Sequence, residues 1–218
     1  MNSRRTLLHS AGRAATSAWP SADRHDDRFI AVPNDLGPAV QATLVPETRR
    51  PVALFGHSIL GVTAVLAAAR VRPAALVLVE PALYDLVRGD AAVEQHIGAV
   101  TEARALAATG DLRGFWGILR PLMFGGAFDA ARWEDELPVA ERWARAPLPW
   151  GNGVRDRMVE GIPTLVVTGG WNAEYEAIAR RLGAIGAEHV VLAGAQHRPQ
   201  DLSAFGPVVD HFLDNAVG

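Results

Sequence analysis

The chain has 218 residues, of which 49% are hydrophobic and 21% are charged, and its formal net charge is −3. These values are typical of one globular domain, and the absence of long runs of like charge argues against a nucleic-acid partner. No apolar stretch reaches the roughly 18 residues that a membrane-spanning helix needs, so we expect no membrane partner.

Two residue types are missing from the sequence. The chain has 0 cysteines, which excludes disulfides, a thiol nucleophile and a thiolate metal site. All 21 basic residues are arginines, so neither a phosphate-binding lysine of the Walker type nor a lysine Schiff base is available. The preference for Arg and Ala indicates a GC-rich bacterial coding sequence.

The first residues are similar to the beginning of a twin-arginine export signal, with Arg4 and Arg5 followed by two leucines. His9, Ser10 and Gly12 interrupt the apolar run that such a signal requires. We therefore expect a strand at this point and a cytoplasmic protein.

Six short apolar runs, each bounded by turn residues, have the pattern of buried parallel strands. They are Thr6–His9, Phe29–Pro33, Val52–Phe55, Ala75–Glu80, Thr164–Thr168 and His189–Ala193. Helical patterns lie between or after them, at Gly61–Arg70, Glu174–Ile185 and Phe205–Leu213. Because strands alternate with helices, the sequence predicts an α/β fold with a doubly wound, mostly parallel sheet of about six strands.

The stretch from about residue 82 to 162 contains no strand pattern. It holds helical patterns at Val93–Ala108, Leu112–Met123 and Ala140–Ala146, and four of the six tryptophans: Trp116, Trp133, Trp143 and Trp150. Ligand sites are commonly lined by aromatic side chains, which favours a helical lid at 83–161 inserted into a core of residues 1–82 and 162–218. The alternative is a helical layer that only covers the sheet.

The clearest local motif is Gly56-His57-Ser58-Ile59-Leu60-Gly61, which joins a predicted strand to a helix. Small residues allow a sharp turn here, and Ser58 at its apex presents a hydroxyl beyond the end of the sheet. The alternative is an ordinary turn in which Ser58 caps the helix.

A serine nucleophile needs a base and an acid that orients the base. Of the seven histidines, His197 lies in a loop directly after the last predicted strand, where it can reach the carboxyl edge of the sheet. His25, His96, His189 and His211 have no comparable context and are expected at the surface or in packing.

With these motifs, nearly the whole chain resembles the α/β-hydrolase superfamily, in particular short bacterial members with a helical cap. The segments that carry the resemblance are residues 56–61, 78–81, 164–170 and 194–197, together with Leu7-Leu8-His9-Ser10-Ala11-Gly12. The resemblance implies that Ser58 is the nucleophile and His197 the base. It also implies that the backbone N–H groups of Ile59 and Ala11 form the oxyanion hole.

The sequence departs from the family pattern at several positions. Leu60 replaces the second glycine of the usual turn, Ser10 replaces a glycine, and Asn172 stands where many members have the catalytic Asp. The chain also starts near the third strand of the family, so the first two strands have no counterpart.

For the acid we select Glu80, at the end of the strand that follows the nucleophile helix, where certain haloalkane dehalogenases are similar in having a Glu. A carboxylate that ends an apolar strand is costly unless it has a partner. Asn172 and Glu174 are the alternatives, and Glu80 itself could instead cap backbone N–H groups or pair with an Arg.

The function we expect is hydrolysis of a small ester, thioester or lactone by a serine hydrolase. The alternatives are a lyase, cyclase or isomerase that uses the same polar site, and a non-catalytic binding protein. We assign His57, Trp116 and Trp171 to substrate binding. The sequence has no His-Glu-x-x-His metal motif and no dinucleotide fingerprint, so we expect a small-molecule substrate with no metal and no cofactor.

Without the first two family strands, Phe29–Pro33 becomes an edge of the sheet. Exposed edges are usually covered. We expect the segment Ala11–Asp27 to cover this edge, or a second copy of the chain to do so in a homodimer.

Overall fold

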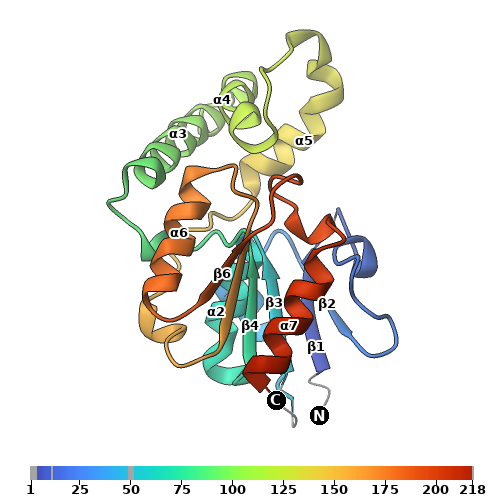
Figure 1. Cartoon of the computed structure of the whole chain (residues 1–218). Coiled ribbons are helices and arrows are strands. Elements are labelled where there is room, and N and C mark those ends of the chain that lie inside the picture. The colour runs from blue at the N-terminus through green and yellow to red at the C-terminus, as the bar shows by residue number, and fades with distance from the viewer. Residues whose placement is uncertain (1–3, 11, 49–51, 218) are drawn as a thin grey trace. The chain divides into compact units, whose positions relative to one another are not determined.

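The computed structural model of the protein describes residues 4–10, 12–48 and 52–217, and Figure 1 shows its course. The chain forms two compact units. One consists of residues 1–88 and 148–218 and contains the sheet, and the other consists of residues 89–147 and is helical.

The sheet has six strands, which all run parallel in the order β2-β1-β3-β4-β5-β6. The strands are β1 (Arg4–Ser10), β2 (Arg28–Val32), β3 (Val52–His57), β4 (Ala75–Val79), β5 (Thr164–Thr168) and β6 (Glu188–Val191). Every residue of β4 and β5 is buried, as continuous apolar runs in a parallel sheet require. The predicted α/β fold with a six-stranded parallel sheet is therefore confirmed.

The chain changes direction across the sheet between β1 and β3. After β1 it moves outward to the edge strand β2, and it then returns to place β3 on the other side of β1. The loops that leave β1 and β3 therefore diverge, and open α/β sheets bind ligands at such a reversal. Ser58 follows β3 directly, which puts the predicted nucleophile at this point of the sheet.

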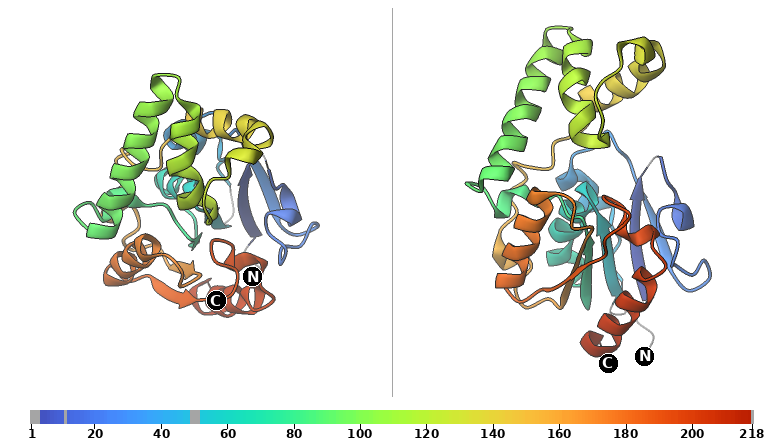
Figure 2. Two further views of the ribbon diagram at one scale, coloured as in Figure 1. Left: turned by 90° about the horizontal axis from the view of Figure 1, so that it is seen from above. Right: turned by 45° about the horizontal axis from the view of Figure 1, so that its top comes forward.

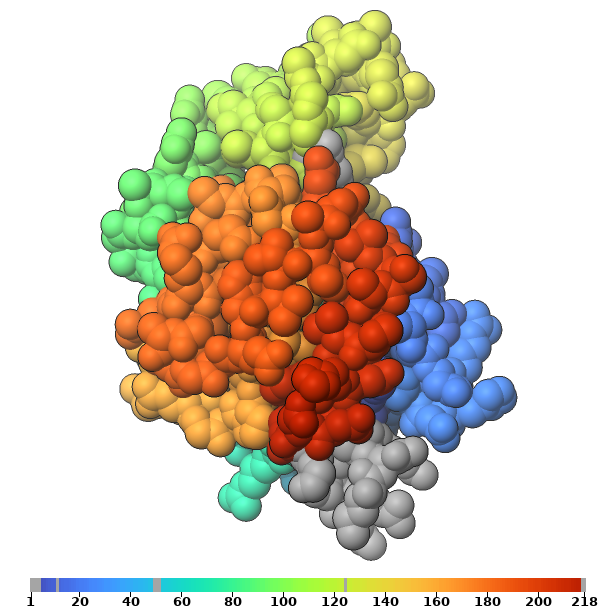
Figure 3. Space-filling model, viewed as in Figure 1, coloured from blue at the N-terminus to red at the C-terminus, as the bar shows by residue number. Residues whose placement is uncertain are grey.

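Four helices of this unit flank the sheet: α1 (Pro38–Leu44), α2 (Ile59–Val71), α6 (Ala173–Ala184) and α7 (Phe205–Val217). Figure 2 shows α7 on one side of the sheet and α1, α2 and α6 on the other, as expected for a doubly wound sheet. On the face seen in Figure 3, α6, β6 and α7 form a continuous surface. Short 3₁₀ turns complete the unit at Ala15–Ser17, Tyr84–Leu86, Asp156–Met158 and Pro199–Asp201.

Trp19 anchors the segment that connects β1 to β2. Its indole is 1% exposed and makes an edge contact with Phe55 of β3, at 5.7 Å between ring centroids. It also packs against Phe205 of α7, and its Nε1 donates to the Leu8 carbonyl at 2.9 Å. The connecting segment thus contributes to the core on the α7 face of the sheet, whereas its expected position over the edge strand stays a prediction.

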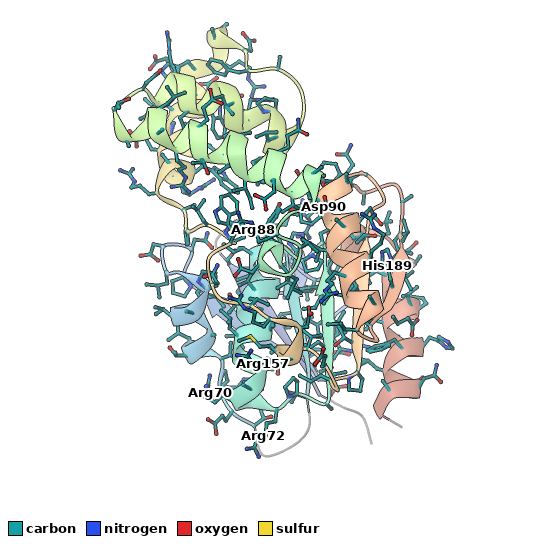
Figure 4. The ribbon with its side chains drawn as sticks, turned by 90° about the vertical axis from the view of Figure 1, so that its left-hand side faces the viewer. Arg70, Arg72, Arg88, Asp90, Arg157 and His189 are labelled. Atoms are coloured by element: carbon teal, nitrogen blue, oxygen red, sulfur yellow. The ribbon has the colours of Figure 1, made fainter. Side chains whose placement is uncertain are left out.

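Arg70 joins the two helices α1 and α2, and Figure 4 shows it near the end of α2 that is remote from Ser58. Its guanidinium donates to the Ala42 carbonyl at 2.8 Å and to the Val45 carbonyl. These carbonyls lie at the end of α1, where Ala42 also accepts from the Val45 N–H, so the arginine adds a charged donor to the carboxyl end of the helix.

The helical unit contains α3 (Ala91–Ala108), α4 (Leu112–Phe124), the turn Ala130–Arg132 and α5 (Trp133–Arg145). Trp116 of α4 is 2% exposed, and its Nε1 donates to Oε2 of Glu136 on α5 at 2.6 Å. This contact gives Trp116 a packing role inside the unit, whereas the sequence analysis assigns it to substrate binding. Arg104 of α3 donates to the carbonyls of Ala144 and Ala146, which fixes the end of α5.

The helical unit, residues 89–147, is shorter than the predicted insertion at 83–161. Hydrogen bonds of Asp85 account for the difference. Its carboxylate accepts hydrogen bonds from the backbone N–H groups of Gly151, Gly153 and Val154, at 2.7, 2.8 and 3.2 Å. These contacts hold both ends of the insertion in the unit that contains the sheet. None of the helices in the described residues has the length and apolarity that a membrane span requires.

We predict that Trp19→Ala lowers the free energy of unfolding by about 3–5 kcal/mol, because it removes a buried aromatic side chain and leaves a cavity. Val40→Ala is the control, since Val40 is 51% exposed and its truncation should change stability by less than about 0.5 kcal/mol. Chemical denaturation of both variants measures the difference. Equal stability of the two variants would contradict the role of Trp19 in the core.

Candidate active site

Ser58 occupies the turn between β3 and α2 in a backbone conformation that side chains rarely adopt, with φ 54° and ψ −125°. Its N–H continues the ladder to the Val79 carbonyl at 2.9 Å. Its carbonyl accepts from the N–H groups of Gly61 and Ala82, at 2.9 and 3.1 Å. The surrounding backbone therefore holds the strained residue in place, as is common at functional sites.

Two glycines permit this turn. A Cβ atom on Gly56 would lie 2.5 Å from the carbonyl oxygen of Leu60, and one on Gly61 would lie 3.0 Å from Cβ of Pro81. Gly61 thus allows the close approach to Pro81, while Leu60 is 5% exposed and is a core residue of α2.

Glu80 follows β4 and is fully buried, with a relative exposure of 0%. Its Oε1 accepts from the Gly169 N–H at 2.6 Å, and its Oε2 accepts from Nε1 of Trp171 at 3.0 Å. Oε2 also lies 3.4 Å from Nδ1 of His197. All three contacts come from donors, which is what a buried carboxylate needs.

The structure therefore brings His197 and Glu80 together across 117 positions of sequence. A carboxylate beside Nδ1 favours the tautomer that carries its proton on this nitrogen, so that Nε2 is free to accept one. Within the described part of the chain no hydrogen bond joins the Ser58 hydroxyl to the His197 ring. Such bonds are often long in sites without substrate and tighten when substrate binds.

Three non-glycine residues with positive φ lie at or directly before the predicted catalytic positions. Ser58 has φ 54°, Glu80 has φ 43°, and Gln196, which precedes His197, has φ 47°. Only two others occur in the described part of the chain, at Ala15 and Arg72, the latter at the end of α2. Local strain is thus concentrated where the candidate site residues leave the sheet.

His57 supports the loop that carries His197. Its Nε2 lies 2.8 Å from the His197 carbonyl, and because a carbonyl can only accept, Nε2 of His57 carries a proton. The centroids of the His57 and His197 rings lie 4.7 Å apart. Burial, followed by the charge of His197, lowers the pKa of His57 well below its usual value, so the ring stays neutral. The sequence analysis assigns His57 to substrate binding, whereas its contact here is to the backbone of the base.

The loop after β5 holds the remaining candidates. Trp171 is 39% exposed and stands edge-on to the His197 ring at 6.2 Å between centroids, so it can contact both a ligand and the base. Asn172 caps α6, since its side chain accepts from the Glu174 N–H at 2.8 Å. The Asn172 side chain therefore caps α6, and the carboxylate that contacts His197 belongs to Glu80.

The structure describes only one of the two backbone N–H groups that were predicted to form the oxyanion hole. Ile59 is the first residue of α2, where a backbone N–H has no partner within the helix and is available to an anion. Ala11 lies outside the described residues. Its neighbour Ser10 ends β1 and forms an isolated antiparallel bridge with Arg13.

Tyr175 is the site residue that the sequence analysis missed. It lies in the first turn of α6 and is 6% exposed, and its ring is 5.2 Å from the His197 ring between centroids. Burial, followed by the negative charges of Glu80 and Glu174, raises the pKa of its hydroxyl well above the usual value. The helical periodicity of α6 accounts for Tyr175 as a core residue, and only its position at the carboxyl end of β5 points to the site.

Among the described residues, no group of three or more His, Cys, Asp or Glu side chains is arranged to hold a metal ion.

Comparison with known proteins identifies the fold. No protein-family model and no curated protein matches the sequence. Solved structures do match, among them MenH from S. aureus, which has a TM-score of 0.65 and 12% identity over 100% of this chain and 96% of that chain. NosK from Streptomyces actuosus has a TM-score of 0.58 and 19% identity over 100% of both chains.

A thermophilic esterase from Thermogutta terrifontis has a TM-score of 0.55 and 17% identity over 98% of this chain and 90% of that chain. The similar structures are α/β-hydrolase fold proteins, and this chain has the same fold.

We predict that Gly169→Ala displaces the loop that carries His197, because the added Cβ would lie 2.1 Å from the carbonyl oxygen of Gln196. Overpacking of this kind costs about 1–3 kcal/mol of folding free energy. It should also shift the NMR signals of the His197 ring.

The matched control is Gly183→Ala in α6, where no atom lies within 4 Å of the added Cβ. Alanine should stabilise the helix there by up to about 1 kcal/mol. Unchanged stability and unchanged NMR signals of the His197 ring in Gly169→Ala would show that the loop accommodates the side chain.

Proposed function

We propose that this protein is a serine hydrolase that acts on a small ester, thioester or lactone, with Ser58 as nucleophile, His197 as base and Glu80 as acid. The observation that carries the proposal is the contact between Oε2 of the fully buried Glu80 and Nδ1 of His197 at 3.4 Å, beside a strained turn that presents Ser58. The fold, which this chain shares with a thermophilic esterase, supports the reaction class.

His197, Ser58 and the Ile59 N–H each have a separate role in the proposed reaction. Nε2 of His197 takes the Ser58 hydroxyl proton while Oγ forms a bond to the substrate carbonyl carbon. The negative charge that develops on the carbonyl oxygen faces the Ile59 N–H at the start of α2. The protonated imidazole then gives its proton to the leaving group, and water repeats the sequence to release the acid and restore Ser58.

Glu80 keeps the imidazole in the reactive tautomer and stabilises its charged form. Burial strengthens this effect, because the carboxylate is screened from water. Trp171, partly exposed beside His197, is proposed to contact the substrate. The helical unit of residues 89–147 is proposed to be the cap that selects the substrate, an assignment that rests on its place between β4 and β5 in the sequence.

We predict that Ser58→Ala loses covalent labelling by a fluorophosphonate and loses ester turnover by several orders of magnitude, since the nucleophile acts as a unit with its base. The control is Ser203→Ala, because Ser203 is an exposed serine outside the site. Mass spectrometry of the labelled protein locates the modified residue. Labelling of Ser58 without hydrolysis of esters or thioesters would favour a lyase, cyclase or isomerase, and the absence of labelling would favour a binding protein.

We predict that Glu80→Gln lowers kcat by on the order of 10³–10⁴-fold, because a neutral amide neither selects the tautomer nor stabilises the imidazolium. Asn172→Ala is the comparison, since it removes only the cap of α6 and should cost about 1 kcal/mol of stability with little change in kcat. Steady-state kinetics of the two variants tests the assignment. A larger loss in Asn172→Ala than in Glu80→Gln would transfer the role of the acid to the loop after β5.

A further inference from the structure

The side chain of Trp171 contacts the proposed acid and is also exposed to solvent. Its indole Nε1 donates to Oε2 of the fully buried Glu80 at 3.0 Å, while the residue is 39% exposed. Among the exposed large hydrophobic residues of the described chain, Trp171 is the only aromatic one. The polar edge of the indole thus binds a buried charge, and part of its apolar surface is open to a ligand.

The short segment that carries Trp171 binds both oxygens of the Glu80 carboxylate. The Gly169 N–H donates to Oε1 at 2.6 Å, and the indole donates to Oε2. Gly170 lies between the two donors with φ 67°, and a Cβ atom on it would lie 2.8 Å from Cγ1 of Val191. The turn therefore requires a glycine, and it directs two donors from one segment to the same carboxylate.

Oε2 of Glu80 is shared by Trp171 and His197. The indole nitrogen lies 3.0 Å from this oxygen, and Nδ1 of His197 lies 3.4 Å from it. The two rings stand edge to face, with an interplanar angle of 76°. Hydrogen bonds to a charged acceptor are strong and directional, so donors on both oxygens fix the plane of the carboxylate. The plane of the carboxylate in turn decides where Oε2 meets the imidazole.

We propose that Trp171 is a positioning residue for the acid, whose indole N–H holds Oε2 of Glu80 against Nδ1 of His197 while its exposed ring contacts an apolar group of the substrate. The inference rests on the proposed hydrolase function. It deepens that function by assigning the orientation of the acid and the contact with the substrate to opposite parts of one side chain.

Two substitutions of Trp171 separate the donor from the ring. Trp171→Phe keeps an aromatic ring and removes the N–H group. Trp171→His keeps an N–H group, because the imidazole matches the five-membered ring of the indole and its Nε2 corresponds to the indole Nε1. It removes the fused benzene ring, and with it most of the apolar surface. The two variants therefore lose different parts of the proposed role.

The test measures the steady-state kinetics of the full chain with an ester of an apolar acid. We expect Trp171→Phe to lower kcat roughly 10- to 100-fold, the effect of one lost hydrogen bond to a charged group, with KM within about threefold of the wild-type value. We expect Trp171→His to keep kcat within about threefold and to raise KM roughly 5- to 10-fold, because apolar contact area is lost.

Leu44→Ala is the control, because Leu44 is an exposed apolar residue on α1 and is 47% exposed. It should change neither kcat nor KM by more than about twofold. A kcat in Trp171→Phe within threefold of the wild-type value would overturn the proposal, and so would an equal loss of kcat in Trp171→Phe and Trp171→His.

A second measurement does not depend on the folding of the Trp171 variants. The ¹H–¹⁵N NMR signal of the Trp171 indole should move upfield in Glu80→Gln, since a neutral amide is a weaker acceptor than a carboxylate. The indole signal of Trp116, which donates to Glu136 in the helical unit, is the internal control and should stay in place. An unchanged Trp171 signal in Glu80→Gln would overturn the proposal.

Failure of the inference and failure of the proposed function are distinguishable. If a fluorophosphonate does not label Ser58 of the wild-type protein and no ester is hydrolysed, the hydrolase function fails and the inference fails with it. If the wild-type protein is labelled and Trp171→Phe retains the wild-type kcat, only the positioning role of Trp171 fails.

Discussion

The fully buried carboxylate of Glu80 determines most of the arrangement around it. A charge without access to water is tolerated only where donors surround it. The donors here come from the backbone of Gly169, the indole of Trp171 and the ring of His197. Two loops that follow β5 and β6 are thus drawn to the end of β4. The same requirement that stabilises the carboxylate brings the histidine to the edge of the sheet near Ser58.

His197 is held from two directions. Glu80 contacts its ring, while His57 donates to its backbone carbonyl from the strand that leads to Ser58. The neutral state of His57 is part of this arrangement, because the hydrogen bond needs a single proton on Nε2 and burial disfavours a second charge beside His197. Tyr175 packs along the same ring. A loop residue thereby acquires a defined orientation from side chains of three different elements.

The sheet could be predicted from the sequence, because continuous apolar runs such as Ala75–Val79 are typical of strands buried on both faces of a parallel sheet. It also located Ser58, because the spacing of Gly56 and Gly61 encodes the tight turn. Partners that depend on folded geometry were harder to predict. Nothing in the sequence indicates that Asp85 binds the backbone at 151–154, which moves the boundary of the helical unit, or that Tyr175 faces the site as well as the core.

Glu80 lies at the end of β4 and not in the loop after β5, so the proposed acid and the partly exposed Trp171 come from different segments of the chain. Ser58 and Glu80 leave neighbouring central strands, and backbone bonds from Ser58 to Val79 and Ala82 tie the two exits together. The proposed nucleophile and the proposed acid are therefore tied together by backbone hydrogen bonds at the ends of two paired strands, whereas His197 lies in the longer loop after β6. The segment after β5, with Trp171 and Asn172, has no carboxylate to hold in register with the base. Evolutionary change in this segment is therefore limited by the two donors that it supplies to Glu80, the Gly169 N–H and the Trp171 indole, and not by a carboxylate of its own.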